Sequence, residues 1–133
     1  MRHTEKTHGS SIRQSYKSWG EEQIARLLDR HGITYQYEYP LAVHDRGKLR
    51  LYYPDFMLPQ CGLIIEYFGV NGKPAYDGQT SRKLGVYRQA GIDGLYLTRD
   101  SLRGDWPTKI LDGIEGILQA RLDRFHGCRH DTK

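Results

Sequence analysis

Two strand-like runs joined by a very short connection constrain the fold of this chain most. The runs cover residues 49–58 and 62–70, and both are rich in aliphatic and aromatic side chains. Proline and glycine stand at the two ends of the connection, Pro59-Gln60-Cys61-Gly62, as is typical of a tight turn. Two such runs separated by a few turn residues predict an antiparallel hairpin inside a sheet.

The register of this hairpin is expected to bring two acidic residues together. With residues 59–62 as the loop, Phe56 lies opposite Ile65, and Asp55 lies opposite Glu66 with Cβ atoms roughly 4.5–5.5 Å apart. Glu66 also interrupts an apolar run, where a charge is costly. Facing carboxylates favour either a protonated acid or a cation between them, and a hard divalent cation such as Mg²⁺ suits oxygen ligands. The alternative is that Asp55 lies at a solvent edge and Glu66 pairs with an arginine or a lysine.

The rest of the chain predicts one domain of mixed α and β structure. Periodicity and helix-end signals indicate a helix from Ser18 to Gly32, a strand over 33–43, a polar turn over 44–48, a loop over 71–79, a helix over 80–90, a strand over 94–99 and a final amphipathic helix from Pro107 to Phe125. The order α-β-β-β-α-β-α favours an α/β (α+β mixed) fold with a mixed four-stranded sheet flanked by helices. We expect a single domain over residues 17–126, a basic, loosely ordered segment over 1–16 and a tail over 127–133.

Composition narrows the class of protein and its partners. The chain has 133 residues, of which 38% are hydrophobic and 27% charged, as is typical of one soluble globular domain. No apolar run approaches the roughly 18 residues of a membrane span, and the start lacks a secretory signal. Only Cys61 and Cys128 are present, which predicts reduced thiols and a cytoplasmic setting, or the host cytoplasm for a phage-encoded protein. The net charge of +4 and the pI near 9.1 favour an anionic partner.

A third acidic residue is expected to face the core from the first helix. At about 100° per residue, Glu21 lies roughly 20° around the helix from Leu28, whereas Glu22 points roughly 160° away from Ile24. Glu21 is therefore a candidate metal ligand or water-positioning group. The alternative is a helix-start carboxylate that forms a capping box with Ser18 and is favoured by the helix dipole.

Aromatic residues allow two interpretations. Tyrosines at positions 35, 37 and 39 alternate along one predicted strand, with further tyrosines at 52 and 53. Such a row is typical of sheet packing, and stacking on nucleobases is the alternative. Trp19 and Trp106 are predicted to be core residues or to staple helix ends.

These residues resemble the PD-(D/E)XK nuclease superfamily. Its restriction-endonuclease-like core runs helix, three strands, helix, strand, and its signature is Pro-Asp, a spacer, then Asp/Glu-x-Lys on the next strand. Pro54-Asp55 and Glu66 match this signature, and Glu21 matches an acid on the preceding helix. The resemblance covers roughly residues 18–99.

One position departs from the signature, because Phe68 stands where the family has lysine. Some branches place this lysine on the following helix. The run Glu66-Tyr67-Phe68-Gly69, followed by Lys83 and then Tyr87 four residues later, is similar to those branches. Lys83 is then the catalytic cation, with Lys73 as the next candidate and Arg82, or no cation, as the remaining possibilities.

The resemblance implies a metal-dependent endodeoxyribonuclease. Asp55, Glu66 and the carbonyl of Tyr67 would hold one or two Mg²⁺ ions, with Mn²⁺ able to substitute. Lys83 would orient the attacking water or stabilise the charge on phosphate, and Glu21 would complete the outer coordination. The basic residues expected to contact DNA are Arg13, Lys17, Lys73 and Arg82.

The substrate expected from the resemblance is branched or duplex DNA. A nearly bare catalytic core is similar to small Holliday junction resolvases, which act as homodimers, with DNA recombination or repair as the setting. The final helix or the tyrosine-rich strand would supply the two-fold interface. The alternatives are a sequence-specific nuclease of the restriction, mismatch-repair or homing type, and a non-catalytic DNA-binding module in which Phe68 reflects lost chemistry.

Overall fold

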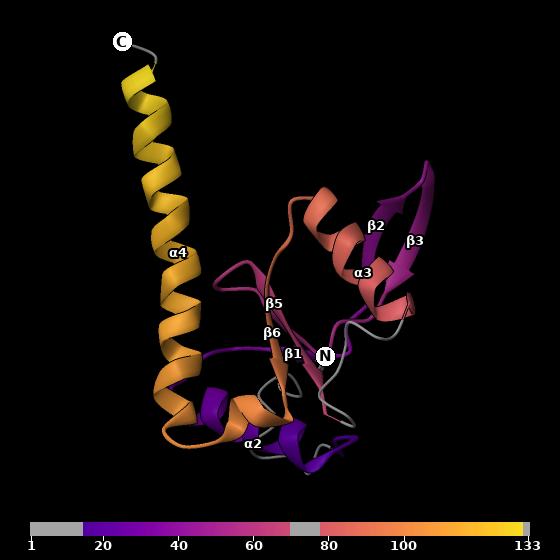
Figure 1. Ribbon diagram of the computed structural model, residues 1–133, viewed down its shortest axis with the longest axis vertical. Coiled ribbons are helices and arrows are strands. Elements are labelled where there is room, and N and C mark those ends of the chain that lie inside the picture. Colours follow the sequence, from indigo (N-terminus) through magenta and orange to yellow (C-terminus); the bar gives the residue numbers. More distant parts are fainter. Residues whose placement is uncertain (1–14, 70–77, 132–133) are drawn as a thin grey trace, which may run out of the picture.

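A four-stranded mixed sheet lies at the centre of the computed structural model, which describes residues 15–69 and 78–131 (Figure 1). Its strand order is β1-β4-β5-β6, and the bounds are β1 (Gln36–Tyr37), β4 (Phe56–Leu58), β5 (Leu63–Phe68) and β6 (Asp93–Thr98). Neighbouring strands are antiparallel except β5 and β6, which are parallel. The mixed α and β class and the four-stranded mixed sheet are thus confirmed.

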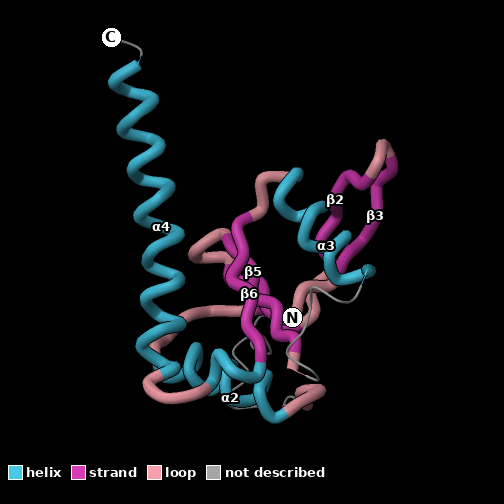
Figure 2. Tube along the Cα trace, viewed as in Figure 1, coloured by secondary structure: helices cyan, strands magenta, loops and turns pink. Residues whose placement is uncertain are grey.

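Helices cover both faces of this sheet (Figures 1 and 2). The described residues form α2 (Trp19–Arg30), α3 (Gly78–Gln89), α4 (Trp106–Asp131) and the short 3-10 helix η2 (Arg99–Leu102). The main core joins α2 and α4 to one face of the sheet and contains Ile24, Leu27, Leu28, Phe56, Leu58, Leu63, Ile65, Leu97, Ile110 and Ile114. Because side chains alternate along a strand, Ile64 and Glu66 point to the other face. Helix α3 lies on that side of the sheet (Figure 1), and its buried Tyr87 donates a hydrogen bond to Glu66.

The central hairpin has the register that the sequence predicts. Strand β4 pairs with β5 through Leu58↔Leu63, Met57↔Ile64 and Phe56↔Ile65. The ladder ends there, so Asp55 lies one residue beyond β4, at the level of Glu66 in β5. Within residues 15–69 and 78–131, no strand therefore pairs with the β4-facing edge of β5 at Glu66 and Tyr67, whereas β6 pairs with the opposite edge.

The two long strands predicted over 33–43 and 49–58 are wrong, because each is broken in the middle. The end of the first predicted strand and the start of the second form a separate two-stranded sheet, β2 (Leu41–Asp45) with β3 (Lys48–Tyr52). Pro40 and Pro54 stand in the two breaks, and proline has no N–H to donate to a ladder. The turn of this hairpin is also shorter than the predicted 44–48, since Arg46 and Gly47 alone carry the positive φ angles of a two-residue turn.

The ends of the first helix follow the sequence signals closely. Ser18 caps α2, and its hydroxyl accepts a hydrogen bond from the Glu21 N–H. At the other end Gly32 has φ +66°, and the N–H groups of Gly32 and Ile33 donate to Asp29 and Leu28 carbonyls. This pair of bonds is the glycine-terminated helix end that the sequence predicts.

The last helix is longer than predicted. It starts at Trp106 and continues to Asp131, beyond the predicted end of this helix at Phe125. Its C-terminal half extends past the sheet (Figure 1), and there Leu118, Leu122 and Phe125 are exposed. None of the helices in residues 15–69 and 78–131 is long and apolar enough to cross a membrane.

The predicted basic segment over 1–16 falls mostly outside the described residues. Of its members, Tyr16 is described, and its hydroxyl hydrogen bonds to the hydroxyl of Tyr35. Its ring also packs edge-on against Tyr37. Residue 16 therefore belongs to the folded domain.

Candidate active site

Asp55 and Glu66 lie buried at the point where β4 ends. Asp55 is 6% exposed and Glu66 is 2% exposed. Oδ2 of Asp55 accepts a hydrogen bond of 2.7 Å from the backbone N–H of Tyr67, the residue after Glu66. This bond takes the place of the ladder bond that the missing strand would have made, and it fixes Asp55 against the open edge of β5.

Helix α3 supplies two partners to the Glu66 carboxylate. Nζ of Lys83 lies 3.4 Å from Oε1, and the hydroxyl of Tyr87 donates to Oε2 at 3.1 Å. Residues four apart share one face of a helix, so Lys83 and Tyr87 reach the same side chain. The structure thus brings Lys83 to Glu66, which is the placement expected for a lysine moved from strand to helix.

Burial shifts both acids toward the protonated form. Loss of solvation raises the pKa of Asp55 to about 6, and nearby Glu21 acts in the same direction against the Tyr67 N–H, Lys17 and Lys83. Loss of solvation likewise raises the pKa of Glu66 to about 7, with Lys83 opposing the shift and Asp55 adding to it. Near neutral pH the metal-free pair is therefore divided between charged and protonated states.

Glu21 faces the interior, as helical geometry predicts. It is 4% exposed, whereas Glu22 is partly exposed and pairs with Arg26. Oε1 of Glu21 accepts hydrogen bonds from the Tyr37 hydroxyl and from the backbone N–H of Lys17. Its carboxylate is close enough to Asp55 to raise the pKa of that residue.

The donor chemistry fits a hard divalent cation, although the described residues do not form a closed ligand cage. Asp55 and Glu66 offer carboxylate oxygens of the kind that Mg²⁺ binds, and both are buried, so a cation between them would offset the loss of solvation of their charged forms. Within residues 15–69 and 78–131, no three His, Cys, Asp or Glu side chains converge closely enough to hold a metal ion. Glu21 is therefore placed beside the two acids and outside a direct three-carboxylate set.

Of the four residues predicted to contact DNA, the structure describes Lys17 and Arg82. Nζ of Lys17 lies 2.8 Å from Glu38 and 3.8 Å from Asp55, so this lysine borders the site. Nη2 of Arg82 lies 2.6 Å from Oδ2 of Asp45, which ties α3 to the β2–β3 hairpin. Arg13 and Lys73 lie outside the described residues.

Sequence reasoning missed the environment of Asp45. This residue is 3% exposed and accepts a hydrogen bond from the Tyr52 hydroxyl, while Arg50 and Arg82 lie within ion-pair distance of it. The ring of Tyr52 packs edge-on against Tyr87, which contacts Glu66. The spacing of Lys83 and Tyr87 was a usable signal for Tyr87, whereas nothing in the local sequence marks the contact of Asp45 with α3.

Comparisons of the chain with protein-family models, with curated proteins and with solved structures found no match. Function is therefore inferred from the chemistry of the residues themselves.

Proposed function

We propose that this protein is a Mg²⁺-dependent endonuclease that hydrolyses phosphodiester bonds in DNA. The observation that carries the proposal is the pair of buried carboxylates, Asp55 and Glu66, at an open strand edge with Lys83 against one of them. Burying two acids side by side costs free energy unless a cation or a proton compensates them. Buried, strongly perturbed acids of this kind cluster at catalytic and binding sites.

Asp55, Glu66 and the main-chain carbonyl of Tyr67 hold the cation in this proposal. In a strand the N–H and C=O of one residue point to the same edge, and the Tyr67 N–H points at Asp55. The Tyr67 carbonyl therefore faces the same open edge as the two carboxylates. Bound Mg²⁺, or Mn²⁺ in its place, lowers the pKa of a water ligand and neutralises charge on the phosphate.

The remaining residues orient the groups that touch the substrate. Lys83 stabilises the negative charge that develops on the phosphate, and together with Tyr87 it fixes the Glu66 carboxylate. Glu21 is a positioning residue, because its Oε1 is held by Tyr37 and by the Lys17 N–H beside Asp55. In the reaction the water oxygen would bond to phosphorus and give up one proton to solvent. The bond from phosphorus to the departing sugar oxygen would break, and that oxygen would take up one proton.

The substrate in this proposal is branched DNA, cut by a homodimer in the manner of a Holliday junction resolvase. The described residues hold no zinc finger or helix-turn-helix that would read base sequence. The exposed apolar residues on the projecting half of α4 offer a two-fold interface, which is the first of the two interfaces expected from the sequence. A dimer would carry two sites related by symmetry.

The test of nuclease activity is cleavage of DNA in the presence and absence of Mg²⁺. We expect cleavage that needs the cation and disappears in Asp55→Asn and in Glu66→Gln, while DNA binding in EDTA persists. Asp112→Asn is the matched control, because Asp112 is an exposed acid on α4. Equal cleavage by the wild type and both site variants would show that the activity lies elsewhere. A chain that binds DNA and never cleaves it would be a non-catalytic module.

A further inference from the structure

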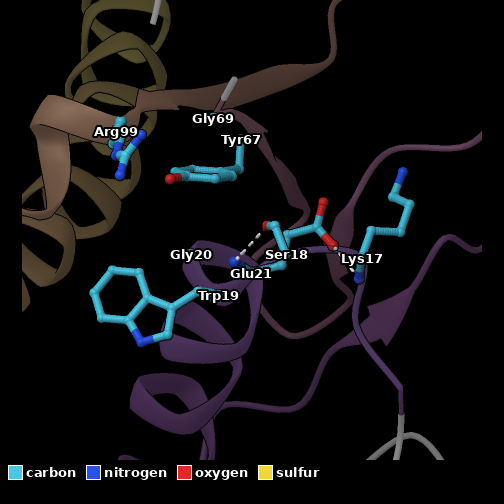
Figure 3. A pocket seen from close by; sticks show the side chains of 8 residues that line it. All are labelled: Lys17, Ser18, Trp19, Gly20, Glu21, Tyr67, Gly69 and Arg99. Carbon is cyan, nitrogen blue, oxygen red and sulfur yellow. Dashed lines mark hydrogen bonds between the residues drawn. The ribbon is translucent and has the colours of Figure 1, made fainter. Parts of the chain in front are cut away.

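A pocket of about 470 Å³ opens beside the N-terminus of α2, next to the candidate active site (Figure 3). Its lining comes from the start of α2, the end of β5 and the start of η2, and comprises Lys17, Ser18, Trp19, Gly20, Glu21, Tyr67, Gly69 and Arg99. Three of these residues, Lys17, Glu21 and Tyr67, also belong to the surroundings of Asp55. The volume falls in the range of roughly 300–1,000 Å³ that is usual for small-ligand sites.

One wall of the pocket is an aromatic ring held between two glycines. A Cβ atom on Gly20 would lie 2.2 Å from Cζ of Tyr67, and a Cβ atom on Gly69 would lie 2.4 Å from its Cε2. Neither position therefore accepts a side chain unless the ring moves. The ring of Tyr67 therefore lies directly against the backbone at Gly20 and Gly69.

The other side of the opening carries an exposed tryptophan. Trp19 is 64% exposed, so the prediction that it packs in the core or staples the helix is wrong, whereas Trp106 does pack against the core. Figure 3 shows the indole of Trp19 and the ring of Tyr67 on two sides of the opening, with the Tyr67 hydroxyl directed toward Arg99. Two aromatic rings that face one opening offer apolar faces together with polar N–H and O–H groups, which is why tryptophan and tyrosine are enriched at binding surfaces.

Cationic groups border these rings. Burial raises the pKa of the Tyr67 hydroxyl, and the exposed Arg99 lies close enough to oppose that shift. The side chain of Lys17 is 62% exposed and also lies beside Asp55. Aromatic faces for stacking together with cations for phosphate are the combination that recognises single nucleotides of an unpaired strand.

We propose that this pocket receives one unstacked nucleobase of the DNA strand whose phosphate lies at Asp55 and Glu66. The proposal rests on the proposed nuclease function. The base stacks on the indole of Trp19 within reach of the Tyr67 ring, and Arg99 contacts the adjacent phosphate. The backbone of Tyr67 binds Asp55 while its ring lines the pocket, so base and phosphate sites are joined through one residue.

The pocket restricts the substrate class. Removing a base from a duplex stack costs a few kcal/mol, and the cost is least where the base is already unpaired. The protein therefore favours DNA that has an unpaired or easily unstacked nucleotide next to the cleaved bond. A continuous, fully paired duplex is the poorer ligand.

The experiment separates base stacking from cleavage. Asp55→Asn in EDTA is titrated with a short single-stranded oligonucleotide and with DNA that carries the fluorescent base 2-aminopurine at successive positions around the cleavage site. Adding Trp19→Ala should weaken binding of the oligonucleotide roughly 5- to 100-fold, the scale of one base–aromatic stack, and abolish the fluorescence change at one position. Trp19→Phe should retain most of both. Leu49→Ala, which removes a comparably exposed apolar side chain on β3, is the control.

A second variant pair tests the phosphate contact. Arg99→Ala should reduce the slope of the logarithm of the DNA-binding constant against the logarithm of the salt concentration by about one. Arg103→Ala should leave this slope unchanged, because Arg103 follows η2, is exposed and pairs with Asp100. Unchanged affinity and an unchanged fluorescence signal in folded Trp19→Ala would overturn the pocket assignment, even if Mg²⁺-dependent cleavage is found. Base stacking on Trp19 without any DNA cleavage would instead support the pocket assignment and contradict the proposed nuclease function.

Discussion

The hydroxyl of Tyr87 donates a hydrogen bond to Oε2 of Glu66 across 3.1 Å, and both side chains are buried. Lys83, one turn earlier on α3, approaches the other oxygen of the same carboxylate. Helix α3 therefore holds both oxygens of the acid from the face of the sheet opposite the main core. This arrangement orients Glu66 before any substrate or cation arrives, which is what a preorganised site requires.

Removing the lysine should cost activity with little effect on binding. Lys83→Ala takes away the positive charge beside Glu66, and we expect the cleavage rate to fall on the order of 10²-fold or more. Single-turnover cleavage and DNA affinity are measured side by side, with Lys109→Ala, an exposed lysine on α4, as the control. Full activity of Lys83→Ala together with an inactive Lys73→Ala would transfer the catalytic role to Lys73.

Removing only the tyrosine hydroxyl should change the pH dependence of the reaction. The hydroxyl of Tyr87 lowers the pKa of Glu66 by donating to its charged form, so Tyr87→Phe raises that pKa further above about 7. We expect the acidic limb of the pH–rate profile to move to higher pH while the buried ring keeps the fold intact. Tyr39→Phe, at an exposed position, serves as the comparison. A profile identical to that of the wild type would mean that Glu66 does not titrate in the reaction.

The metal-free protein should lose stability as pH rises from about 4 to about 7. The folded-state pKa values of Asp55 and Glu66, about 6 and about 7, lie above the ordinary values of 3.8 and 4.5. In this window the folded protein binds more protons than the unfolded chain, so the free energy of unfolding falls with rising pH. The loss is on the order of 3 kcal/mol for each acid, since a pKa difference of one corresponds to about 1.4 kcal/mol.

Urea denaturation in EDTA at pH 4 and pH 8, on either side of this window, measures the loss. Asp55→Asn and Glu66→Gln should each show a smaller difference between the two pH values, and added Mg²⁺ should restore stability to the wild type at pH 8. Asp112→Asn should behave as the wild type does. An equal pH dependence of the free energy of unfolding in all four proteins would mean that folding does not raise the pKa of either acid.

Local sequence signals predicted the parts of the site that depend on strand register and helix phase. The hairpin register followed from the four-residue connection, and the inward direction of Glu21 followed from its angular position on the helix. The strand breaks were not predicted, although Pro40 and Pro54 carried the physical reason for them. The contact of Asp45 with Arg82 could not be predicted, because it depends on where α3 docks on a separate hairpin.

The projecting half of α4 should join two copies of the chain. Leu118, Leu122 and Phe125 follow one another at intervals of four and three residues, the spacing of an apolar seam between two helices, and all three are exposed. We expect Leu122→Glu to convert a dimer to a monomer in sedimentation analysis. Ala120→Glu, on the opposite side of the helix, should leave the dimer intact. A wild-type monomer at micromolar concentration would contradict this interface.

Cleavage should depend on the shape of the DNA more than on its sequence. The cations Lys17 and Arg99 line the pocket that we propose to receive an unstacked base, and a dimer would place two Asp55 and Glu66 sites on opposite strands. We expect a four-way junction to be cut in preference to a linear duplex of the same sequence, with paired symmetric nicks and with binding that weakens steeply as salt rises. In Leu122→Glu the nicks should become unpaired, because the two sites are no longer held together.

The assay compares junctions and duplexes of several sequences at one salt concentration and maps the product ends. Cutting of linear duplex at one fixed sequence, with no preference for junctions, would contradict the proposal of a branched substrate and indicate a sequence-specific nuclease. The proposed metal-dependent chemistry of Asp55 and Glu66 would not be contradicted by that result.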